Sequence, residues 1–159
     1  MDYPEIFMPE EEYHPVAVAR TMLLDRIDLG VAQEIIAYIE DSEAPMRVAQ
    51  LRVLGGAMAR IPIEATAYAH RKSRIMVNLA AFYEDEAERV VREAWVEAFQ
   101  AALKQQDDGV YVNFLGANGL DQIQRAYPGS TLQRLAEVKQ RYDPTNLFRM
   151  NHNIPPANS

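Results

Sequence analysis

Apolar side chains recur at helical spacing in two well-separated stretches of the chain. Residues 85–103 give the stronger signal, because their apolar positions follow the i, i+3, i+4 pattern without a break and include Trp95 and Phe99. A second helix is predicted from about Asp28, whose side chain can cap it. It should end before residues 42–45, because a residue that precedes proline is displaced from the helical conformation.

The last third of the chain carries two further helical signals. A short helix is predicted over about 118–126. Ser130 and Gln133 have the spacing of a capping box, so a longer helix should begin there, run through Arg141 and end at Asp143. We expect this helix to bury Leu132, Leu135 and Val138.

Strand signals fill the middle of the chain. Residues 46–54 and 74–83 are rich in apolar and β-branched side chains, and residues 110–114 have the sequence VYVNF. A glycine pair directly after the first of these stretches should end that strand, and residues 57–61 are expected to form another short strand beyond it.

The predicted order is a helix, two or three strands, the long helix, a strand and two helices. Because strands and helices do not alternate strictly, the predicted fold class is α+β, with an antiparallel sheet and helices packed mainly on one face. Residues 1–19 contain acidic residues and prolines and are predicted to be an arm or connector. Residues 20–159 are predicted to form one folded unit.

Composition narrows the classes of function. The chain has 159 residues, a formal net charge of −7 and no cysteine. An acidic surface repels phosphate backbones, so nucleic acid is not an expected partner, and the lack of cysteine excludes disulfides and thiol catalysis. The histidines are isolated and show no metal-ligand spacing, and no apolar run reaches the ~18 residues of a membrane span. We therefore expect no metal site and no membrane partner, with the cytoplasm as the default compartment.

Polar side chains share one face of each predicted strand. In the last of them, Tyr111 and Asn113 lie on the face opposite the valines and the phenylalanine, because side chains alternate along a strand. Arg52 shares a face with Gln50, and Asn78 stands in the middle of its strand. The pattern favours either a polar face that binds a ligand or an ordinary solvent-exposed face of an antiparallel sheet.

His70, followed by Arg71, is a further candidate for chemistry. A lone histidine is more often a structural hydrogen-bonding group than a catalyst, and both interpretations stay open. The chain contains no Gly-x-Ser-x-Gly, no P-loop and no Gly-x-Gly-x-x-Gly sequence. Its motifs therefore provide no cradle for a phosphate or pyrophosphate.

Three stretches together resemble one family. LRVLGGAMARIPIEATAYAHR (51–71), GVYVNFLG (109–116) and YPGSTLQRLAEVKQRYDPTNLFRMNHNIPP (127–156) are similar to the C-terminal third of berberine bridge enzyme-like, FAD-linked oxidoreductases. The likeness runs from about residue 20 to residue 156. It implies that residues 20–159 are part of a substrate-binding domain and that about 110–156 are the family's berberine-like C-terminal segment.

The resemblance implies roles for four residues of the predicted polar face and its surroundings. Tyr111 would be the acid, base or orienting group for the substrate, and Arg52 would steer the substrate. Many members carry a polar or acidic side chain where Arg52 stands, and an arginine there suits an anionic substrate better. His70 and Asn113 would lie near the flavin, although Ala69 replaces the proline that the family has before its histidine.

The resemblance also offers a reason for the asparagine-rich end of the chain. Asn146 and Asn153 would hydrogen-bond the flavin ring or the neighbouring backbone. Leu147 and Phe148 would anchor the C-terminal segment in the core. These two asparagines complete the set of cofactor-binding residues that the resemblance implies.

Two functions are consistent with these expectations. The resemblance implies the substrate-binding and C-terminal portion of an FAD-dependent oxidoreductase, which moves hydride from a small alcohol, amine or sugar-like substrate to flavin, with a separate FAD-binding domain or subunit as a partner. The alternative is a stand-alone, non-catalytic module that binds a ligand or another protein without FAD. Because no pyrophosphate loop is visible, we do not expect this chain alone to bind FAD tightly. Open sheet edges predict a homodimer.

Overall fold

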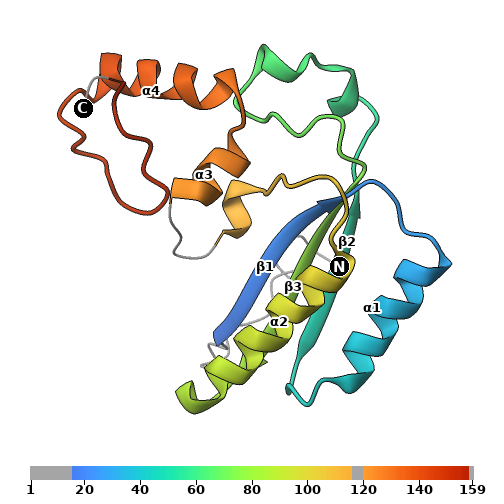
Figure 1. Cartoon of the computed structure of the whole chain (residues 1–159). Coiled ribbons are helices and arrows are strands. Elements are labelled where there is room, and N and C mark those ends of the chain that lie inside the picture. The colour runs from blue at the N-terminus through green and yellow to red at the C-terminus, as the bar shows by residue number, and fades with distance from the viewer. Residues whose placement is uncertain (1–15, 116–119, 158–159) are drawn as a thin grey trace, which may run out of the picture.

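A three-stranded antiparallel sheet forms the centre of the computed structural model, which describes residues 16–115 and 120–157. The strands are β1 (Val16–Leu24), β2 (Arg47–Val53) and β3 (Ile75–Tyr83), and their order in the sheet is β1-β3-β2. β3 is central and pairs with β1 along one edge and with β2 along the other. The sheet and its helices confirm the predicted α+β class (Figure 1).

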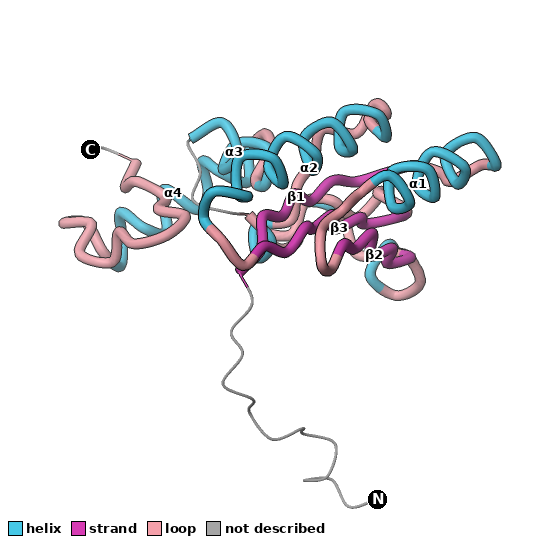
Figure 2. The backbone as a smooth tube through the Cα atoms, turned by 90° about the horizontal axis from the view of Figure 1, so that it is seen from below, coloured by secondary structure: helices cyan, strands magenta, loops and turns pink. Residues whose placement is uncertain are grey.

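Two helices cover one face of this sheet. Figure 2 shows α1 (Leu29–Asp41) and α2 (Arg89–Leu103) on the same side of the strands. Phe99 of α2 is fully buried, and its ring stacks on Tyr38 of α1 with the centroids 4.6 Å apart. Trp95 packs against the same core and meets Phe99 edge to face. We call β1, β2, β3, α1 and α2 together the sheet layer.

The last stretch that the structure describes forms a second region, which we call the C-terminal lobe (residues 120–157). It contains α3 (Leu120–Ala126), α4 (Ser130–Tyr142) and the segment that follows them (Figure 1). The segment folds back along α4, where the Ala157 N–H donates to the carbonyl of Ala136. Arg134 joins the lobe to the rest of the molecule by donating to the carbonyl of Glu64.

Three elements confirm the sequence predictions closely. The Asp28 carboxylate accepts the N–H of Val31 at 3.1 Å, so it caps α1 as expected. β2 and β3 lie within the two strongest strand predictions. Gly55 and Gly56 follow β2 with φ of 143° and 59°, conformations that glycine adopts without strain.

The sheet differs from the prediction in its membership. β1 was not predicted, and residues 16–19, which were assigned to the arm, belong to it. The predicted strands at 57–61 and 110–114 are wrong, because these residues form the 3₁₀ turns η2 (Met58–Arg60) and η5 (Val112–Phe114). With both edges of β3 already occupied, residues 112–115 satisfy their backbone locally, through bonds such as Phe114 N–H to the Tyr111 carbonyl.

The long helix also starts later and buries less than its pattern suggested. Residues 86–88 form a separate 3₁₀ turn, η4 (Glu86–Glu88), and Val90 and Val91 of the predicted apolar stripe are 74% and 62% exposed. The sheet is too short to cover the first turns of α2. Its edge on that side is the pair formed by Val16, the first residue of β1, and Tyr83, the last residue of β3. Burial concentrates instead at Val96, Phe99 and Leu103.

The predicted capping box of α4 does not form. Gly129, with φ of 62°, is the residue before the helix, and no side chain caps the first turn. Gln133 instead donates to Glu137 one turn further along. Leu132 and Leu135 are half-buried, but Val138 is 53% exposed, so this helix has only a shallow apolar contact.

Candidate functional site

A cavity of about 760 Å³ lies on the sheet face that α1 and α2 leave open. Met76 of β3 and Arg52 of β2, which are partners in the sheet register, both line it. The neighbouring β3 residues Val77 and Leu79 point the other way, into the core with Phe99. We call this cavity the tyrosine pocket, and the polar and aromatic residues that line it include Arg52, Tyr68, His70, Arg71, Tyr111, Asn113 and Tyr127.

Aromatic rings form part of the wall of the tyrosine pocket. The rings of Tyr68 and Tyr111 meet edge to face with their centroids 6.1 Å apart, and Tyr111 meets Phe114 in the same way at 5.5 Å. Tyr68 also contacts the edge of His70 at 5.9 Å. Edge-to-face contacts of this kind hold rings in fixed orientations, so the wall is preorganised for a flat apolar ligand.

Tyr111 and Asn113 come together as the sequence predicted, although the backbone between them is a 3₁₀ turn and not a strand. The Asn113 amide donates to the Tyr111 hydroxyl oxygen at 2.7 Å. Because this oxygen already accepts a bond, its own proton is available for an acceptor in the pocket. The pair is thus arranged to present a hydrogen-bond donor beside the aromatic wall.

His70 is buried and forms a hydrogen bond with the C-terminal lobe. Its Nε2 lies 3.1 Å from the carbonyl oxygen of Ala126 in α3. Gly109 packs so tightly against the ring that an added Cβ would come within 2.4 Å of His70 Nδ1. These contacts show a structural hydrogen bond at the pocket wall.

The two arginines of the tyrosine pocket differ in setting. Arg52 is exposed, and its guanidinium carbon lies 4.9 Å from the centroid of the Phe114 ring. Arg71 is only 8% exposed and donates to the Met58 carbonyl and to the Thr66 hydroxyl. Its Nε has no partner among the described residues.

Burial acts on the tyrosines as well. It raises the pKa of Tyr68, and the neighbouring Tyr111 raises that pKa further while the Arg71 charge opposes the shift. Burial and the proximity of Tyr111 also raise the pKa of Tyr127. Both hydroxyl groups therefore stay protonated near neutral pH and add no negative charge to the pocket.

Asn146 and Asn153 lie elsewhere, in the C-terminal segment, and do not line the tyrosine pocket. Their Oδ1 atoms are buried, and neither receives a hydrogen bond from a described residue. Asn146 has φ of 53°, a left-handed conformation that asparagine tolerates better than most residues. An unsatisfied buried acceptor costs about 1–3 kcal/mol, and the flavin or backbone partner expected for these two asparagines stays a prediction.

Leu147 and Phe148 do not anchor the segment in the core, and that prediction is wrong. They are 74% and 77% exposed. The Asp143 carboxylate accepts both of their backbone N–H groups, and Lys139 binds the same carboxylate and the Phe148 carbonyl. The segment is therefore held by polar bonds to its backbone, with its apolar side chains turned outward.

Sequence reasoning missed three residues of the pocket. Tyr68 and Tyr127 carry no periodic signal, and Arg71 was noted only as the neighbour of His70. Tyr68 and Arg71 share the loop before β3, whereas Tyr127 follows α3, so only the fold brings them together. Asn78, predicted on the same face, is in the sheet but not among the residues that line the pocket.

The described part of the chain contains neither a cluster of metal ligands nor a membrane-spanning helix. Residues 16–115 and 120–157 contain no group of three or more histidine, aspartate or glutamate side chains that could hold a metal ion. Within the same residues, no helix has the length and apolar character needed to cross a lipid bilayer.

Known sequences match this chain over part of their length. The family model described as "Berberine and berberine like" matches residues 110–155. An uncharacterized FAD-linked oxidoreductase of Bacillus subtilis, YgaK, is 31% identical over 66% of this chain, and a xylooligosaccharide oxidase of Thermothelomyces thermophilus is 33% identical over 64%. The chain spans 23% and 22% of the lengths of these two relatives.

Solved structures match nearly all of the fold. The structure of berberine bridge enzyme-like protein 28 from Arabidopsis thaliana superposes with a TM-score of 0.81 over 99% of this chain and 37% of its own, at 21% identity. A chitooligosaccharide oxidase gives a TM-score of 0.70 over 90% of this chain and 33% of its own, at 20% identity. With the sequence matches, these findings show that the chain is similar to the C-terminal portion of berberine bridge enzyme-like, FAD-linked oxidoreductases and shares the fold of that portion.

Proposed function

We propose that this chain supplies the substrate-binding wall and the C-terminal segment of an FAD-dependent oxidoreductase that oxidises a small alcohol, amine or sugar-like substrate. The observation that carries the proposal is the tyrosine pocket. It gathers Arg52, His70, Tyr111 and Asn113, which the resemblance selected, on the one sheet face that the helices leave open. The matches to FAD-linked oxidoreductases and to a xylooligosaccharide oxidase support this class of reaction.

In this proposal FAD, when bound, supplies the hydride acceptor, and the residues of this chain orient the substrate. Tyr111 donates its proton to, or accepts one from, the substrate oxygen or nitrogen. Asn113 fixes the Tyr111 hydroxyl through the 2.7 Å bond and would be a residue that helps to hold the flavin. Arg52 attracts the substrate at the exposed side of the pocket, while His70 holds the wall to α3 through Ala126.

Co-expression with the FAD-binding domain of a family relative tests this proposal. The complex should turn yellow, survive desalting and show bleaching of the flavin absorbance when an oxidisable substrate is added without oxygen. Tyr111→Phe should slow the bleaching by about a hundredfold, the usual contribution of a positioned acid or base. Tyr38→Phe is the matched control, because Tyr38 lies in α1 on the opposite side of the sheet, where its hydroxyl donates to the Ala98 carbonyl and its ring stacks on Phe99.

Two results would overturn the proposal. One is a complex that binds FAD but whose flavin is reduced equally fast with Tyr111→Phe and with the unchanged chain. The other is a chain that never associates with a flavin domain and shows no bound flavin, which would favour a stand-alone binding module. The compartment proposed with this function is the cytoplasm, and subcellular fractionation tests that assignment.

We propose a homodimer for the chain by itself, with the outer edge of β2 as its contact. Among the described residues β2 pairs only with β3, and at its end Val53 is 88% exposed. An unpaired strand edge favours pairing with another strand, and a two-fold arrangement closes it. Light scattering coupled to size-exclusion chromatography should give twice the mass of 18.1 kDa at tens of micromolar, and a single-chain mass would exclude the dimer.

A further inference from the structure

The charge of the tyrosine pocket is opposite to the charge of the chain as a whole. Aspartate and glutamate outnumber lysine and arginine by 23 to 16 in the sequence. The pocket is nevertheless lined by two arginines and by no aspartate or glutamate among the described residues. The carboxylate that acts on Tyr68, Asp107, is already engaged by the Ser73 hydroxyl and the Gly109 N–H, and it is not one of the lining residues.

Arg71 is a buried cation that lacks a counter-charge. Its hydrogen-bond partners, the Met58 carbonyl and the Thr66 hydroxyl, are both neutral, as is the Tyr68 ring that lies 5.5 Å from its guanidinium carbon, and its Nε has no partner among the residues that the structure describes. The ion pairs found among the described residues do not include it. Arginine cannot lose its proton to escape this situation, so a buried guanidinium is stabilised when an anion binds close to it.

Arg52 adds a second cation that an approaching ligand can reach. It is exposed, takes part in none of the ion pairs among the described residues, and is held over the Phe114 ring. A guanidinium fixed in this way keeps its planar donor edge free, which is the geometry that binds a carboxylate through two parallel hydrogen bonds.

The walls between the two arginines determine the shape of the ligand. The edge-to-face rings of Tyr68 and Tyr111 offer apolar surface, and the hydroxyl groups of Tyr68 and Tyr127 stay uncharged. A phosphate or another small inorganic anion would leave this surface unused. A flat apolar body that carries one negative charge would use both the rings and the cations.

We infer that the tyrosine pocket binds an aromatic carboxylate, with Arg52 pairing with the carboxylate group and Arg71 supplying the buried positive charge. This rests on the proposed function in that the bound acid is then the substrate, oxidised at an alcohol or amine carbon. Binding itself requires only this chain. It can therefore be measured without FAD and without turnover.

Three probes of one shape and different charge test this inference on the whole chain. They are 4-(hydroxymethyl)benzoate, its neutral amide and the corresponding cationic benzylamine, each titrated by calorimetry and by ¹H–¹⁵N NMR that includes the arginine Nε–H signals. The carboxylate should bind at least about tenfold more tightly than the amide, the gain expected of a hydrogen-bonded charge pair, and the amine should bind least. The Arg71 Nε–H signal should shift with the carboxylate probe.

Variants locate the binding site and separate the alternatives. Arg52→Gln should reduce the affinity for the carboxylate to that for the amide, and Arg52→Lys should recover part of it. Arg89→Gln, at the start of α2, makes the same change in net charge far from the pocket and should have no effect. If inorganic phosphate displaced the carboxylate probe at an equal concentration, the aromatic rings would contribute nothing to binding. That result would overturn the inference.

Equal binding of the three probes, no binding of any probe, or an unchanged affinity in Arg52→Gln would also overturn it. These failures differ from failure of the proposed function. Carboxylate binding without flavin reduction in the complex would leave the pocket assignment standing and remove the catalytic one. Flavin reduction by a neutral substrate alone would leave the catalytic assignment standing and remove the assignment of the pocket to a carboxylate.

Discussion

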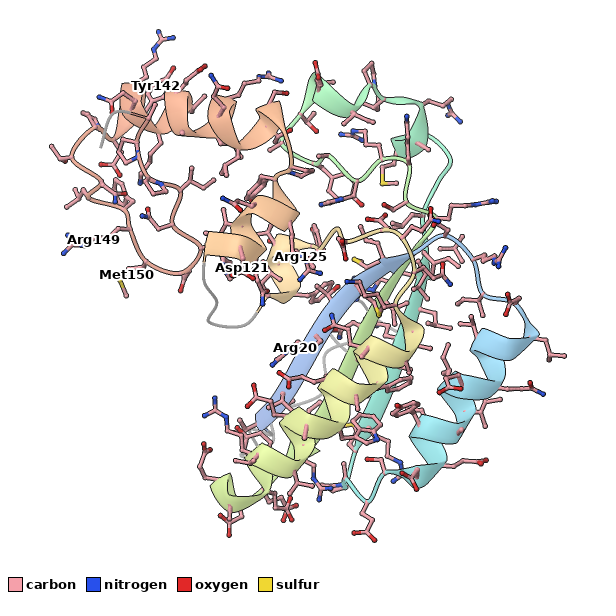
Figure 3. The ribbon with its side chains drawn as sticks, viewed as in Figure 1. Arg20, Asp121, Arg125, Tyr142, Arg149 and Met150 are labelled. Atoms are coloured by element: carbon pink, nitrogen blue, oxygen red, sulfur yellow. The ribbon has the colours of Figure 1, made fainter. Side chains whose placement is uncertain are left out.

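Phe99 of the sheet layer and Phe148 of the C-terminal lobe have opposite exposure to solvent. In the sheet layer, Phe99 and Val77 have no exposed surface, and they belong to one continuous core. In the C-terminal lobe, Phe148 and Met150 are 77% and 82% exposed, and Figure 3 shows Met150 projecting away from the ribbon with Tyr142 and Arg149. The two regions therefore owe their order to different forces.

Burial of apolar surface stabilises the sheet layer, whereas hydrogen bonds hold much of the C-terminal lobe. Asp143 accepts the N–H groups of Leu147 and Phe148, and Lys139 joins it to the segment. Charged bonds at a surface contribute little to stability compared with a packed core. Exposed apolar residues on a polar frame are typical of a surface that another domain or chain covers, which agrees with the proposed flavin-domain partner.

The largest expected difference in stability is between two variants that each lose a phenylalanine ring, one in each region. Phe99→Ala should lower the free energy of unfolding by about 3–5 kcal/mol, because it opens a cavity in a closed core. Phe148→Ala should change it by less than about 0.5 kcal/mol, since the ring is already in water. Urea unfolding followed by Trp95 fluorescence measures both. Similar losses in the two variants would contradict the contrast between the regions.

A smaller effect is expected where the two regions meet at the pocket. Gly109→Ala would place a Cβ 2.4 Å from His70 Nδ1 and 2.8 Å from Leu23, so the His70 bond to Ala126 must shift. We expect a loss of about 1–3 kcal/mol, the usual result of overpacking. Urea unfolding measures the loss, and weaker binding of the carboxylate probe should accompany it.

The control for this substitution is Gly30→Ala. Gly30 lies in the first turn of α1, where an added Cβ meets nothing closer than 3.4 Å. Alanine favours the helix over glycine by up to about 1 kcal/mol, so this variant should be as stable as the unchanged chain or more stable. A Gly109→Ala chain of unchanged stability would show that the pocket wall is looser than the contacts indicate.

The smallest effect should be confined to the C-terminal segment. The hydrogen bond from Lys139, followed by the backbone bonds from Leu147 and Phe148, lowers the pKa of Asp143. Because the pKa of Asp143 is lower in the folded chain, its carboxylate contributes its full stabilisation above the unfolded pKa of about 3.9. This stabilisation is lost as the pH falls through the lower pKa of the folded state. The protection of the Leu147 and Phe148 amides from hydrogen exchange, measured relative to the intrinsic exchange rate at each pH, should therefore fall in acid while β3 remains protected.

Asp143→Asn should give this faster exchange already at neutral pH, because it removes the charge that Lys139 binds. Asp121→Asn, in α3, is the control and should leave the segment unchanged. If acid exposed β3 and the segment together, the C-terminal segment would share the core of the sheet layer and the two regions would not be separable.

Local sequence signals predicted the elements whose stability is decided within one stretch of chain. Asp28 caps α1, the glycine pair ends β2, and β-branched residues form β3, because each depends on neighbouring residues alone. The pairing of Tyr111 with Asn113 was also predicted, although they meet because Tyr111 is the extended residue just before the 3₁₀ turn and not because both lie on a strand. The sequence pattern also singled out Arg52 and His70, which line the pocket, whereas Asn146 and Asn153, to which the family resemblance gave a role, do not.

The tertiary structure decided what depends on competition for partners. The second edge of β3 pairs with β1 and not with residues 110–114. A strand pattern in the sequence does not determine which of two segments pairs with a given edge. The outward turn of Leu147 and Phe148 follows from the polar bonds to Asp143, which hydrophobicity alone would not reveal. Arg71 became a buried cation without a counter-charge only when loop, sheet and α3 met around it, because burial and charge pairing belong to the assembled molecule and to no single stretch of its sequence.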